Sequence, residues 1–322
     1  MLDCTLRIDY PKFQLDVAFV VPRHSVYCLY GPSGSGKSTI LAALIGLIKP
    51  TKSRIVYDGV LLQDDHGQKI APWRRSFSMI EQVPKLFPHM TLAQNIAFAA
   101  GKRTLGDEEQ KLIAQFDLTD RLRYKPHQLS GGFQQQGAFV RALATKPKLL
   151  LLDEPFFALD WQFKEQMIRL FAAYREQNPV TTIFVTHDLR EAQRLADRIG
   201  ILQDGRILRD DRMDAVFSQP QTMPIAKQMG YTSFLSAEKY QHPGQQYLAI
   251  HPDRLIVRKK GIEENGILLG GTIVAMTARE GFYRIEIQLE LGDHVQATVR
   301  HEHTYSVGEK VVVDLGKAVY VV

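Results

Sequence analysis

The chain has little cysteine: Cys4 and Cys28 are the only two cysteines among its 322 residues. Two cysteines do not make a disulfide framework, and Cys28 lies in an apolar segment, so a reduced and buried thiol is expected there. No apolar run approaches the length of a membrane span; residues 149–152, four leucines, are among the longest. Charged residues such as Asp3 and Arg7 stand where a signal peptide would need an apolar core. These absences favour a cytoplasmic protein, for which any link to a membrane would come through a partner.

The chain also lacks a long block of Lys or Arg, although its formal net charge is +5 and its pI is about 9.0. The basic clusters at residues 74–75 and 258–260 are short enough to be solvated surface, so nucleic acid is not expected as a partner. Hydrophobic residues make up 45% and charged residues 23%, which is typical of a globular protein. A length of 322 residues favours two domains.

Two sequence patterns follow one another along the chain. Buried strands are predicted at residues 25–30, 149–152 and 182–186, alternating with helices in the manner of an α/β domain, and residues 91–145 have helical periodicity. From about residue 245 apolar and polar residues alternate between glycine turns, which predicts a small β-barrel or sandwich. Residues 218–224 are interpreted as the beginning of a linker. We therefore expect a domain at 1–235, with a helical subdomain at about 88–145, and a second domain at 245–322.

The most specific segment is residues 31–39, which match the pattern G-x-x-x-x-G-K-[ST] without a gap. A predicted strand precedes the segment and a predicted helix follows it, so backbone N–H groups and a helix N-terminus converge on one place, as suits a polyphosphate. Lys37 would reach the β- and γ-phosphates, and the hydroxyl of Ser38 would be a ligand of Mg²⁺. The expected nucleotide-binding residues are Gly31, Pro32, Ser33, Gly34, Ser35, Gly36, Lys37, Ser38 and Thr39.

A pair of carboxylates ends the apolar strand predicted at residues 149–152. Asp153 is suited to holding Mg²⁺ through water, as an acid on a strand beside a phosphate-binding loop commonly does. Glu154 would then polarise the attacking water as a general base. Solvated turn residues are the alternative interpretation, which the phosphate-binding motif upstream makes the weaker one.

Residues 128–135, Gln-Leu-Ser-Gly-Gly-Phe-Gln-Gln, open a helix and offer a further N-terminus suited to an anion. With this segment the chain resembles the ATP-binding cassette (ABC) family, whose signature is L-S-G-G-Q. The order of motifs matches too: phosphate loop, glutamine loop with Gln82, signature, acid pair, D-loop at 156–160 and switch histidine His187. The resemblance is tight over 31–188, loose over 189–235, and rests on strand texture over 245–322. It implies an α/β P-loop NTPase with a RecA-like core and a helical subdomain, followed by a small all-β, OB-like barrel of the TOBE type.

The resemblance implies an ATPase that works as a homodimer and uses ATP and Mg²⁺. Each ATP would lie between the phosphate loop of one chain and the signature of the other, where the expected contacts are Ser130, Gly131, Gly132 and Gln134. Two helix N-termini would then share the charge of one γ-phosphate, so ATP would hold the dimer together and hydrolysis would release it.

Further roles follow from the same resemblance. His187 would contact the γ-phosphate, and Gln82 would touch Mg²⁺ or the attacking water. Family members usually stack an aromatic residue on adenine, and both Tyr10 and Phe13 lie at a plausible distance upstream of the phosphate loop. The sequence does not decide between these two aromatic residues.

The chain departs from the family pattern at four positions. Phe133 replaces the glutamine of the signature, Gln136 stands where arginine is usual, Gly137 follows inside the helix, and Phe157 replaces a small residue of the D-loop. Phe133 and Phe157 fall at the expected dimer interface, where they would pack, slow hydrolysis or specify a partner. One alternative function is therefore a slowly hydrolysing regulatory nucleotide-binding protein.

Residues 86–91, 217–220 and 230–235 resemble the corresponding segments of binding-protein-dependent importers of sugars, polyamines, iron and oxyanions. The resemblance implies an energy-coupling ATPase, peripheral on the cytoplasmic side of the membrane, whose separate permease docks near residues 82–88, with a periplasmic or extracellular binding protein in the full complex. A soluble ATPase acting on DNA or ribosomes would usually carry two cassettes or a long insertion. A molybdate-like oxyanion or iron is the expected cargo, and a polyamine or sugar is the alternative.

The domain at 245–322 is expected to serve dimerisation and regulation. Oxyanion binding is the alternative there, but Asn265 is preceded by Ile262 instead of the serine of a Ser-x-x-Asn element found in molybdate-type importers. His301 and His303 are interpreted as solvated residues rather than as metal ligands.

Overall fold

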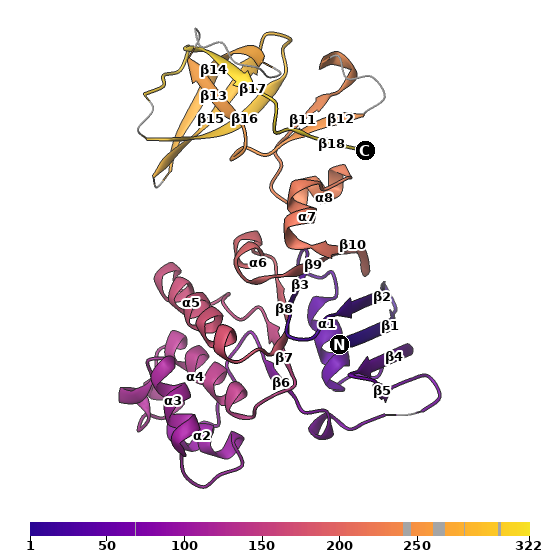
Figure 1. Ribbon diagram of the computed structural model, residues 1–322, viewed down its shortest axis with the longest axis vertical. Coiled ribbons are helices and arrows are strands. Elements are labelled where there is room, and N and C mark those ends of the chain that lie inside the picture. Colours follow the sequence, from indigo (N-terminus) through magenta and orange to yellow (C-terminus); the bar gives the residue numbers. More distant parts are fainter. Residues whose placement is uncertain (68, 241–245, 260–267, 280, 302–303) are drawn as a thin grey trace. The chain divides into compact units, whose positions relative to one another are not determined.

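The computed structural model describes the chain except for residues 68, 241–245, 260–267, 280 and 302–303 (Figure 1). It contains two compact units, Met1–Met213 and Asp214–Val322. The division falls before the boundary at 235–245 that the sequence suggested, because strand β11 (Ser233–Ser236) pairs with β12 (Tyr247–Ile250) and so belongs to the C-terminal unit.

The N-terminal unit begins with an antiparallel sheet in the order β2-β1-β4-β5. Side chains of β2 alternate between buried and exposed, because one face of the strand covers the core and the other meets solvent. Tyr10 pairs with Phe13 at the closed end of the β1–β2 hairpin. The strands are β1 (Leu2–Tyr10), β2 (Phe13–Val21), β4 (Lys52–Tyr57) and β5 (Val60–Gln63).

A second sheet has the order β10-β9-β3-β8-β7-β6, in which β10 is antiparallel to β9 and the other neighbours are parallel. Its central strands β3, β7 and β8 are buried along almost their whole length because both faces of the sheet are covered. The carboxyl ends of β3, β8 and β7 lie side by side, which is where a parallel sheet gathers its functional loops. The strands are β3 (Val26–Tyr30), β6 (Phe77–Ile80), β7 (Leu149–Asp153), β8 (Thr181–Thr186), β9 (Arg198–Gln203) and β10 (Arg206–Arg212).

The described residues of the N-terminal unit form six α-helices, and side-chain caps fix the starts of four. Thr91 forms a capping box with Gln94, and Ser130, Asp160 and Asp188 accept N–H groups of the first turns that follow them. The helices are α1 (Lys37–Ile45), α2 (Leu92–Ala99), α3 (Asp107–Gln115), α4 (Gly131–Ala144), α5 (Trp161–Gln177) and α6 (Leu189–Leu195). Short 3₁₀ turns lie at Pro72–Arg74, Thr119–Arg121 and Pro126–Gln128.

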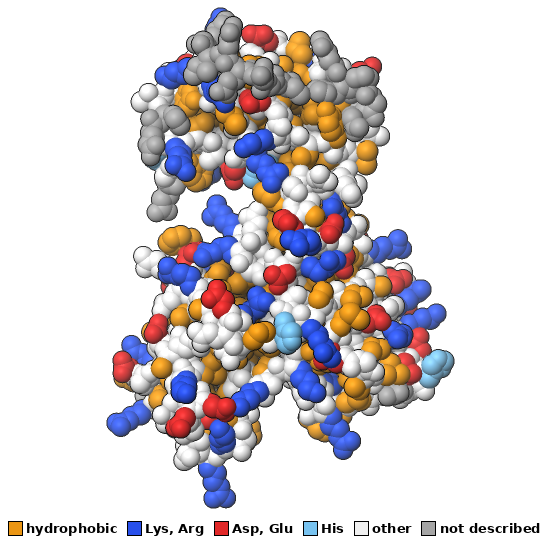
Figure 2. All heavy atoms as spheres, viewed as in Figure 1, with side chains coloured by type: hydrophobic (Ala, Val, Ile, Leu, Met, Phe, Trp, Pro, Cys, Tyr) orange, Lys and Arg blue, Asp and Glu red, His pale blue; other side chains and the backbone are white. Residues whose placement is uncertain are grey.

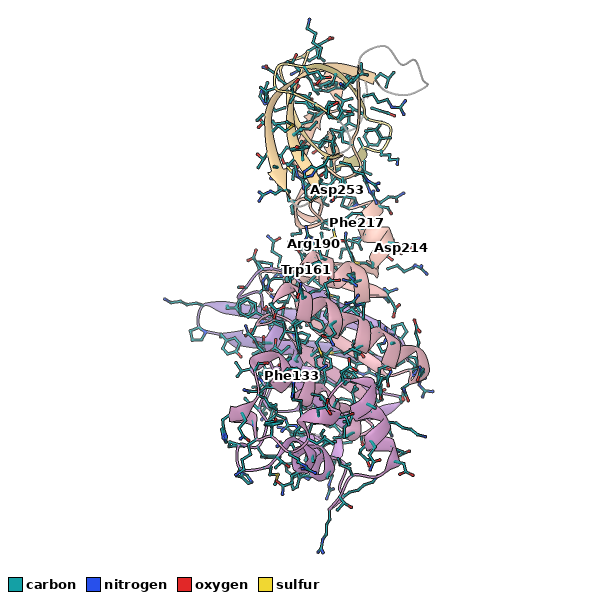
Figure 3. The ribbon with its side chains drawn as sticks, turned by 90° about the vertical axis from the view of Figure 1, so that its left-hand side faces the viewer. Phe133, Trp161, Arg190, Asp214, Phe217 and Asp253 are labelled. Carbon is teal, nitrogen blue, oxygen red and sulfur yellow. The ribbon has the colours of Figure 1, made fainter. Side chains whose placement is uncertain are left out.

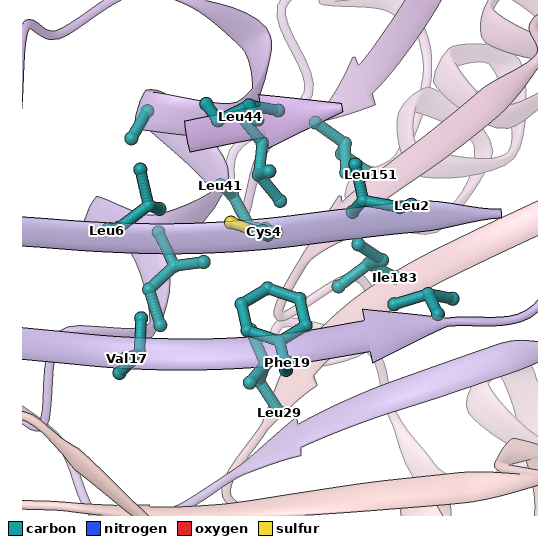
Figure 4. Packing of buried hydrophobic residues seen from close by; sticks show 14 of the residues in the cluster. Leu2, Cys4, Leu6, Val17, Phe19, Leu29, Leu41, Leu44, Leu151 and Ile183 are labelled. Atoms are coloured by element: carbon teal, nitrogen blue, oxygen red, sulfur yellow. The ribbon is translucent and has the colours of Figure 1, made fainter. Parts of the chain in front are cut away.

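The core of this unit joins both sheets through α1. Buried side chains from β1 and β2 meet α1 and the central parallel strands; ten are labelled in Figure 4, among them Cys4, Leu41 and Ile183. Both cysteines are free and buried, as predicted for Cys28, and burial raises the pKa of the Cys4 and Cys28 thiols far above their usual range. The core therefore anchors α1, and with it the loop at residues 31–36, to the parallel sheet.

The C-terminal unit is built mainly of strands. A five-stranded antiparallel sheet has the order β13-β17-β14-β15-β16, and its edge strands β13 and β16 contact each other, so the sheet curls into an OB-like barrel. A small three-stranded sheet in the order β11-β12-β18 lies beside this five-stranded sheet (Figure 1). The strands are β13 (Ile256–Lys259), β14 (Leu268–Arg279), β15 (Phe282–Leu289), β16 (His294–Arg300), β17 (Lys310–Asp314) and β18 (Val319–Val321).

Residues 218–224 do not begin a linker, and that prediction was wrong. Helix α7 (Met213–Ser218) ends there and α8 (Met223–Gln228) begins, with Pro224 in the first turn of α8. Proline is tolerated in a first helical turn because its missing N–H has no partner there in any case. The 3₁₀ turn Glu238–Tyr240 follows β11.

In the part of the chain that the structure describes, no helix combines the length and apolarity that a bilayer crossing requires. On the face shown in Figure 2, Lys and Arg side chains are interspersed with acidic ones.

Candidate nucleotide-binding site

The loop at residues 31–36 joins the end of β3 to the start of α1. Gly36 stands at the N-cap of α1 with φ 102°, a left-handed conformation that a side chain would strain. A Cβ atom on Gly36 would also lie 3.2 Å from Cζ of Phe13. Glycine at this position therefore lets the backbone turn into the helix while the hairpin β1–β2 packs against the loop.

Lys37 is folded over the loop that it follows. Its Nζ donates to the carbonyl oxygens of Gly31 (2.8 Å) and Pro32 (2.9 Å), and the residue is 5% exposed. Burial lowers the pKa of Lys37, while the nearby carboxylates of Glu154 and Asp153 oppose that shift. The ammonium group thus lies within the loop, held by backbone acceptors that phosphate oxygens can replace.

Ser38 and Asp153 are brought together by the fold from positions far apart in the sequence. The hydroxyl of Ser38 donates to Oδ1 of Asp153 at 2.9 Å. Burial raises the pKa of Asp153, the hydrogen bond from Ser38 opposes that rise, and the charge of Glu154 adds to it. A hydroxyl and a carboxylate that share a solvent-facing point are hard oxygen donors, so these residues fit Mg²⁺, which prefers one or two such ligands with phosphate oxygens and water.

Glu154 and His187 form the second pair of the site. Nδ1 of His187 lies 3.1 Å from Oε2 of Glu154, and the side chains are 45% and 15% exposed respectively. Glu154 has φ 43°, an uncommon value for a residue with a side chain, and its N–H donates to the carbonyl of Val185 on β8. Strain of this kind persists where surrounding structure enforces it, and here it directs the carboxylate beyond the strand end.

The signature residues start α4. Ser130 caps the helix, its Oγ accepting from N–H of Phe133 at 3.5 Å, and Gly131 and Gly132 form the first turn. Gln134 donates through Nε2 to the carbonyl of Leu129 at 3.1 Å. Within the described residues, no hydrogen bond or ion pair joins this segment to the loop at 31–36.

Gln82 lies in the exposed segment that follows β6. Tyr10 and Phe13 face each other across the β1–β2 hairpin with ring centroids 6.4 Å apart. Phe13 is partly buried against the core and the loop at Gly36, whereas Tyr10 is 47% exposed. The two candidate aromatic residues therefore form one small surface, of which Tyr10 is the solvent-facing part.

Each of the four departures from the family pattern has a definite place. Phe133 is labelled in Figure 3. Its ring packs edge-on against Phe163 at 5.5 Å, and the guanidinium carbon of Arg121 lies 5.0 Å from its centroid, so Phe133 is engaged within its own chain. Phe157 is 58% exposed, and its ring lies 5.8 Å from that of His187. Phe157 therefore contacts a residue of the site in the same chain.

Gln136 and Gly137 lie inside α4. Gln136 is fully buried, and in the described part of the chain neither its Oε1 nor its Nε2 has a hydrogen-bond partner. A Cβ atom on Gly137 would lie 2.6 Å from Cδ1 of Leu92, so glycine allows α4 to approach α2 closely.

Sequence reasoning missed Lys164 and Gln135. Lys164 binds the two carboxylates that follow His187, and Gln135 donates through Nε2 to the carbonyl of Pro155 at 2.9 Å. Lys164 lies outside the motifs described above, and Gln135 is the last residue of the signature segment 128–135, where no role was expected for it. Their proximity to the site depends on how α4 and α5 pack, which spacing along the chain does not reveal.

In the C-terminal unit, Nε2 of His301 donates to the carbonyl oxygen of Phe282 (3.0 Å), and its ring lies 4.4 Å from that of Tyr283. The Ile262–Asn265 element and His303, which the sequence analysis discussed, lie outside the described residues.

A glycine-rich loop, a pair of carboxylates and a histidine lie at the carboxyl ends of β3, β7 and β8, and the helical layer carries a capped Ser-Gly-Gly. Together these features define a P-loop nucleotide-binding domain of the ATP-binding cassette type. A family model described as ABC transporter matches residues 15–157. The molybdate/tungstate import ATP-binding protein WtpC of Thermococcus kodakarensis is 36% identical over 233 residues, which cover 70% of this chain and 69% of that protein. The chain therefore belongs to the ABC transporter family, which confirms the family resemblance and the predicted fold class.

Two further relatives are also named as import ATP-binding proteins, one of them under the same name. WtpC of Pyrococcus horikoshii is 38% identical over 233 residues, 70% of this chain and 66% of its own length. The spermidine/putrescine import ATP-binding protein PotA of Pseudomonas fluorescens is 38% identical over 223 residues, 66% of this chain and 58% of its own length. The matched part thus spans about two thirds or less of most of these relatives.

Among solved structures, the chain is similar to the dimeric ATP-binding cassette MJ0796 in a post-hydrolysis state bound to ADP and Pi. The TM-score is 0.56 with 28% sequence identity, over 66% of this chain and 99% of the other.

Proposed function

We propose that this chain is the energy-coupling ATPase subunit of a binding-protein-dependent ABC importer. The observation that carries the proposal is the arrangement of two pairs beside the phosphate loop: Ser38 with Asp153 at 2.9 Å, and Glu154 with His187 at 3.1 Å. The two adjacent acids thus face different partners: Asp153 faces the hydroxyl of Ser38, and Glu154 faces His187. Asp153 is therefore available for metal binding and Glu154 for proton transfer.

The proposed reaction is hydrolysis of the γ-phosphoanhydride of ATP. Glu154 accepts a proton from water as the water oxygen bonds to the γ-phosphorus and the bridging bond to the β-phosphate breaks, which releases ADP and phosphate. Lys37 exchanges its two backbone acceptors for phosphate oxygens. Ser38 and Asp153 would hold Mg²⁺, and Gln82 would touch it or the attacking water. When bound, Mg²⁺ neutralises charge on the phosphates.

His187 is suited to report the γ-phosphate. Because Nδ1 faces Glu154, Nε2 is the ring nitrogen that can approach the nucleotide. Donation to both Glu154 and a phosphate oxygen requires a proton on each nitrogen, so the positively charged form is the one that serves both partners.

A homodimer would complete each site. Ser130, Gly131, Gly132 and Gln134 would face the ATP bound by the other chain, which agrees with the absence of bonds between this segment and the loop at 31–36 within the described chain. Phe157 within the D-loop and Trp161 directly after it have exposed rings that would pack at the same interface. The dimeric cassette with similar structure supports this assembly.

Tyr10 is the better candidate to stack on adenine. Phe13 is committed to the loop at Gly36, whereas Tyr10 presents an exposed ring next to it. In this arrangement Phe13 supports Tyr10 from behind, and both aromatic residues contribute.

The permease would dock beside residues 82–88. Val83 is 69% exposed, Phe87 and Phe98 are also exposed, and the rings of Phe87 and Phe98 lie 5.3 Å apart. Arg141 covers Phe87 at 5.5 Å from its centroid. An exposed apolar surface next to Gln82 suits a short helix of a membrane-embedded partner. The chain would then be peripheral, on the cytoplasmic side of the membrane, with a periplasmic or extracellular binding protein across it.

For the cargo we propose a molybdate-like oxyanion, supported by the names of the WtpC relatives. Iron, a polyamine or a sugar would be the alternatives, and a relative named for spermidine and putrescine is of comparable identity. The barrel of the C-terminal unit is proposed to serve dimerisation and regulation.

The test is steady-state ATPase activity with Mg²⁺ for the full chain and for Glu154→Gln, with dimerisation followed by light scattering. We expect a loss of about 100-fold or more in rate, as removal of a general base implies, with ATP still bound and the closed dimer retained. Glu108→Gln is the matched control, because Glu108 is an exposed carboxylate that pairs with Lys146 on the surface.

Equal rates in wild type and Glu154→Gln would remove Glu154 from its proposed role. ATP binding with negligible turnover in the wild type, even beside a permease, would instead support the slowly hydrolysing regulatory alternative. The structural reason for that alternative is the packing of Phe133 against Phe163.

A further inference from the structure

A network of charges surrounds the switch histidine without touching it. Nζ of Lys164 lies 2.6 Å from Oδ2 of Asp188 and 2.5 Å from Oε1 of Glu191. The other oxygen of Glu191, Oε2, accepts from the hydroxyl of Thr186 at 2.6 Å. Thr186 and Asp188 are the two chain neighbours of His187, so the network holds the backbone on both sides of that residue.

The turn at His187 is closed by the same groups. N–H of Asp188 donates to Oγ1 of Thr186 at 3.0 Å, and the carboxylate of Asp188 accepts N–H of Arg190 at the start of α6. With these bonds Thr186, Asp188 and Glu191 have little freedom to move independently. The imidazole of His187 leaves the backbone from the centre of this braced turn.

Lys164 connects the turn to another element. It lies in the first turn of α5, which Asp160 of the D-loop caps by accepting N–H of Phe163 at 2.9 Å. Phe157 in the same D-loop packs its ring against that of His187. His187 is therefore held from the D-loop side in two ways, by ring contact and through the lysine.

The ammonium group of Lys164 compensates the charges of two carboxylates, those of Asp188 and Glu191. Glu191 is 3% exposed, and burial raises the pKa of its carboxyl group, which Lys164 and Thr186 oppose. Burial would also raise the pKa of Asp188, but the hydrogen bond from Lys164 and backbone N–H groups hold it below its usual range. One ammonium group thus serves two carboxylates, and its removal would leave a buried charge without compensation.

We infer that Lys164 is a positioning residue for ATP hydrolysis: from the first turn of α5 it fixes the turn that carries His187, and so holds the histidine against Glu154. The inference rests on the proposed ATPase function. Among the described residues, no hydrogen bond or ion pair joins Lys164 to residues 31–39, and its polar partners are Asp188 and Glu191. Its role is therefore in the arrangement of the catalytic pair and not in the binding of the nucleotide.

The kinetic test compares full-length wild type, Lys164→Met and Lys164→Arg. For Lys164→Met we expect kcat to fall by about tenfold or more while KM for ATP changes by no more than about twofold, because a displaced catalytic group costs rate rather than nucleotide binding. Lys164→Arg should recover kcat to within about threefold of wild type, since a guanidinium group can also bridge two carboxylates.

Lys102→Met is the matched control. Lys102 pairs at 2.8 Å with Glu109, which is also 3% exposed, in the helical layer around α3. Loss of a lysine from a buried carboxylate is common to both variants, so a kcat loss in Lys102→Met as large as in Lys164→Met would overturn the inference. The double variant Lys164→Met/Glu191→Gln removes the uncompensated charge and should fold, yet still have low kcat.

A second readout does not need turnover. Hydrogen–deuterium exchange of peptides within 181–195, measured with ATP bound, should speed up in Lys164→Met. The reason is that Oγ1 of Thr186, which accepts N–H of Asp188, is then no longer held in place through Glu191 and Lys164. Peptides covering 31–45 should keep wild-type protection. Unchanged exchange at 181–195, or unchanged kcat, would overturn the role of Lys164. A wild type without turnover even beside a permease would overturn the proposed function instead, and the exchange result would still decide whether Lys164 holds the turn.

Discussion

Two adjacent glutamines in α4 should respond to the same substitution with opposite sign. Gln136 is fully buried with no hydrogen-bond partner for either amide atom in the described chain, whereas Nε2 of its neighbour Gln135 donates to the carbonyl of Pro155. Methionine matches glutamine in length and lacks its polar atoms. We therefore expect Gln136→Met to stabilise the N-terminal unit and Gln135→Met to destabilise it.

The magnitude follows from the buried groups. An unsatisfied buried polar group costs about 1–3 kcal/mol, and an imperfect fit of the new side chain costs up to about 1.5 kcal/mol, so Gln136→Met should raise the free energy of unfolding by about 1–2 kcal/mol. Gln135→Met loses one hydrogen bond and strips the Pro155 carbonyl of its donor. Because Oε1 of Gln135 is itself unpartnered in the described structure, the net loss should be about 1 kcal/mol.

Thermal unfolding of the full chain, followed for the transition of the N-terminal unit, is the assay. For a unit of this size about 2–4 °C corresponds to 1 kcal/mol, so the two variants should differ in Tm by about 4–12 °C. Urea unfolding should give the same order with unchanged slopes. A Tm for Gln136→Met that lies below wild type would refute the reasoning, because it would mean that the amide of Gln136 is satisfied in the folded chain.

Two further predictions concern the exposed aromatic residue Tyr10 and the buried residue His251. Tyr10→Ala should weaken ATP binding about 3- to 10-fold, the size expected for one lost aromatic stack, with little change in kcat; titration calorimetry with wild type beside Phe13→Leu measures it, and unchanged affinity would exclude Tyr10 as the adenine platform. Burial lowers the pKa of His251 in the C-terminal unit, with Asp253 opposing and Arg254 adding to the shift. Unfolded His251 thus takes up a proton below about pH 6.5 while the folded residue stays neutral, so stability present above that pH is lost on acidification. The Tm of that unit should fall between pH 7.5 and 5.5, more steeply than in His251→Asn; parallel curves would assign the pH dependence to other groups.

Much of the site could be predicted because its parts are local. Residues 31–39 contain their own turn, helix start and lysine, and the strand predicted at 149–152 ends in Asp153 and Glu154, as the structure shows. The ends of β3 and β7 lie at the same edge of the sheet, because parallel strands present their carboxyl ends at one edge. Ser38 and Asp153, 115 positions apart, meet for that reason.

Other features depended on packing between elements that no local pattern relates. Phe133 was expected at a dimer interface, and the structure shows that it also packs on Phe163 and under Arg121 within one chain. The segment 218–224 contains two prolines and suggested a linker, but Pro224 fits the first turn of α8. Composition describes what a segment tolerates, and only its neighbours decide which of the tolerated conformations it adopts.

The sequence by itself determined the chemistry: a phosphate-binding loop, a carboxylate pair, a histidine and a capped Ser-Gly-Gly, each readable because a few consecutive residues dictate backbone geometry and charge. The tertiary structure alone decided how the chemistry is held, with Lys164 between Asp188 and Glu191, Phe157 against His187, and Gln136 enclosed without a partner. These relations join residues from separate helices and strands. They arise when the apolar faces of those elements pack, which brings side chains into contact at distances that spacing along the chain does not encode.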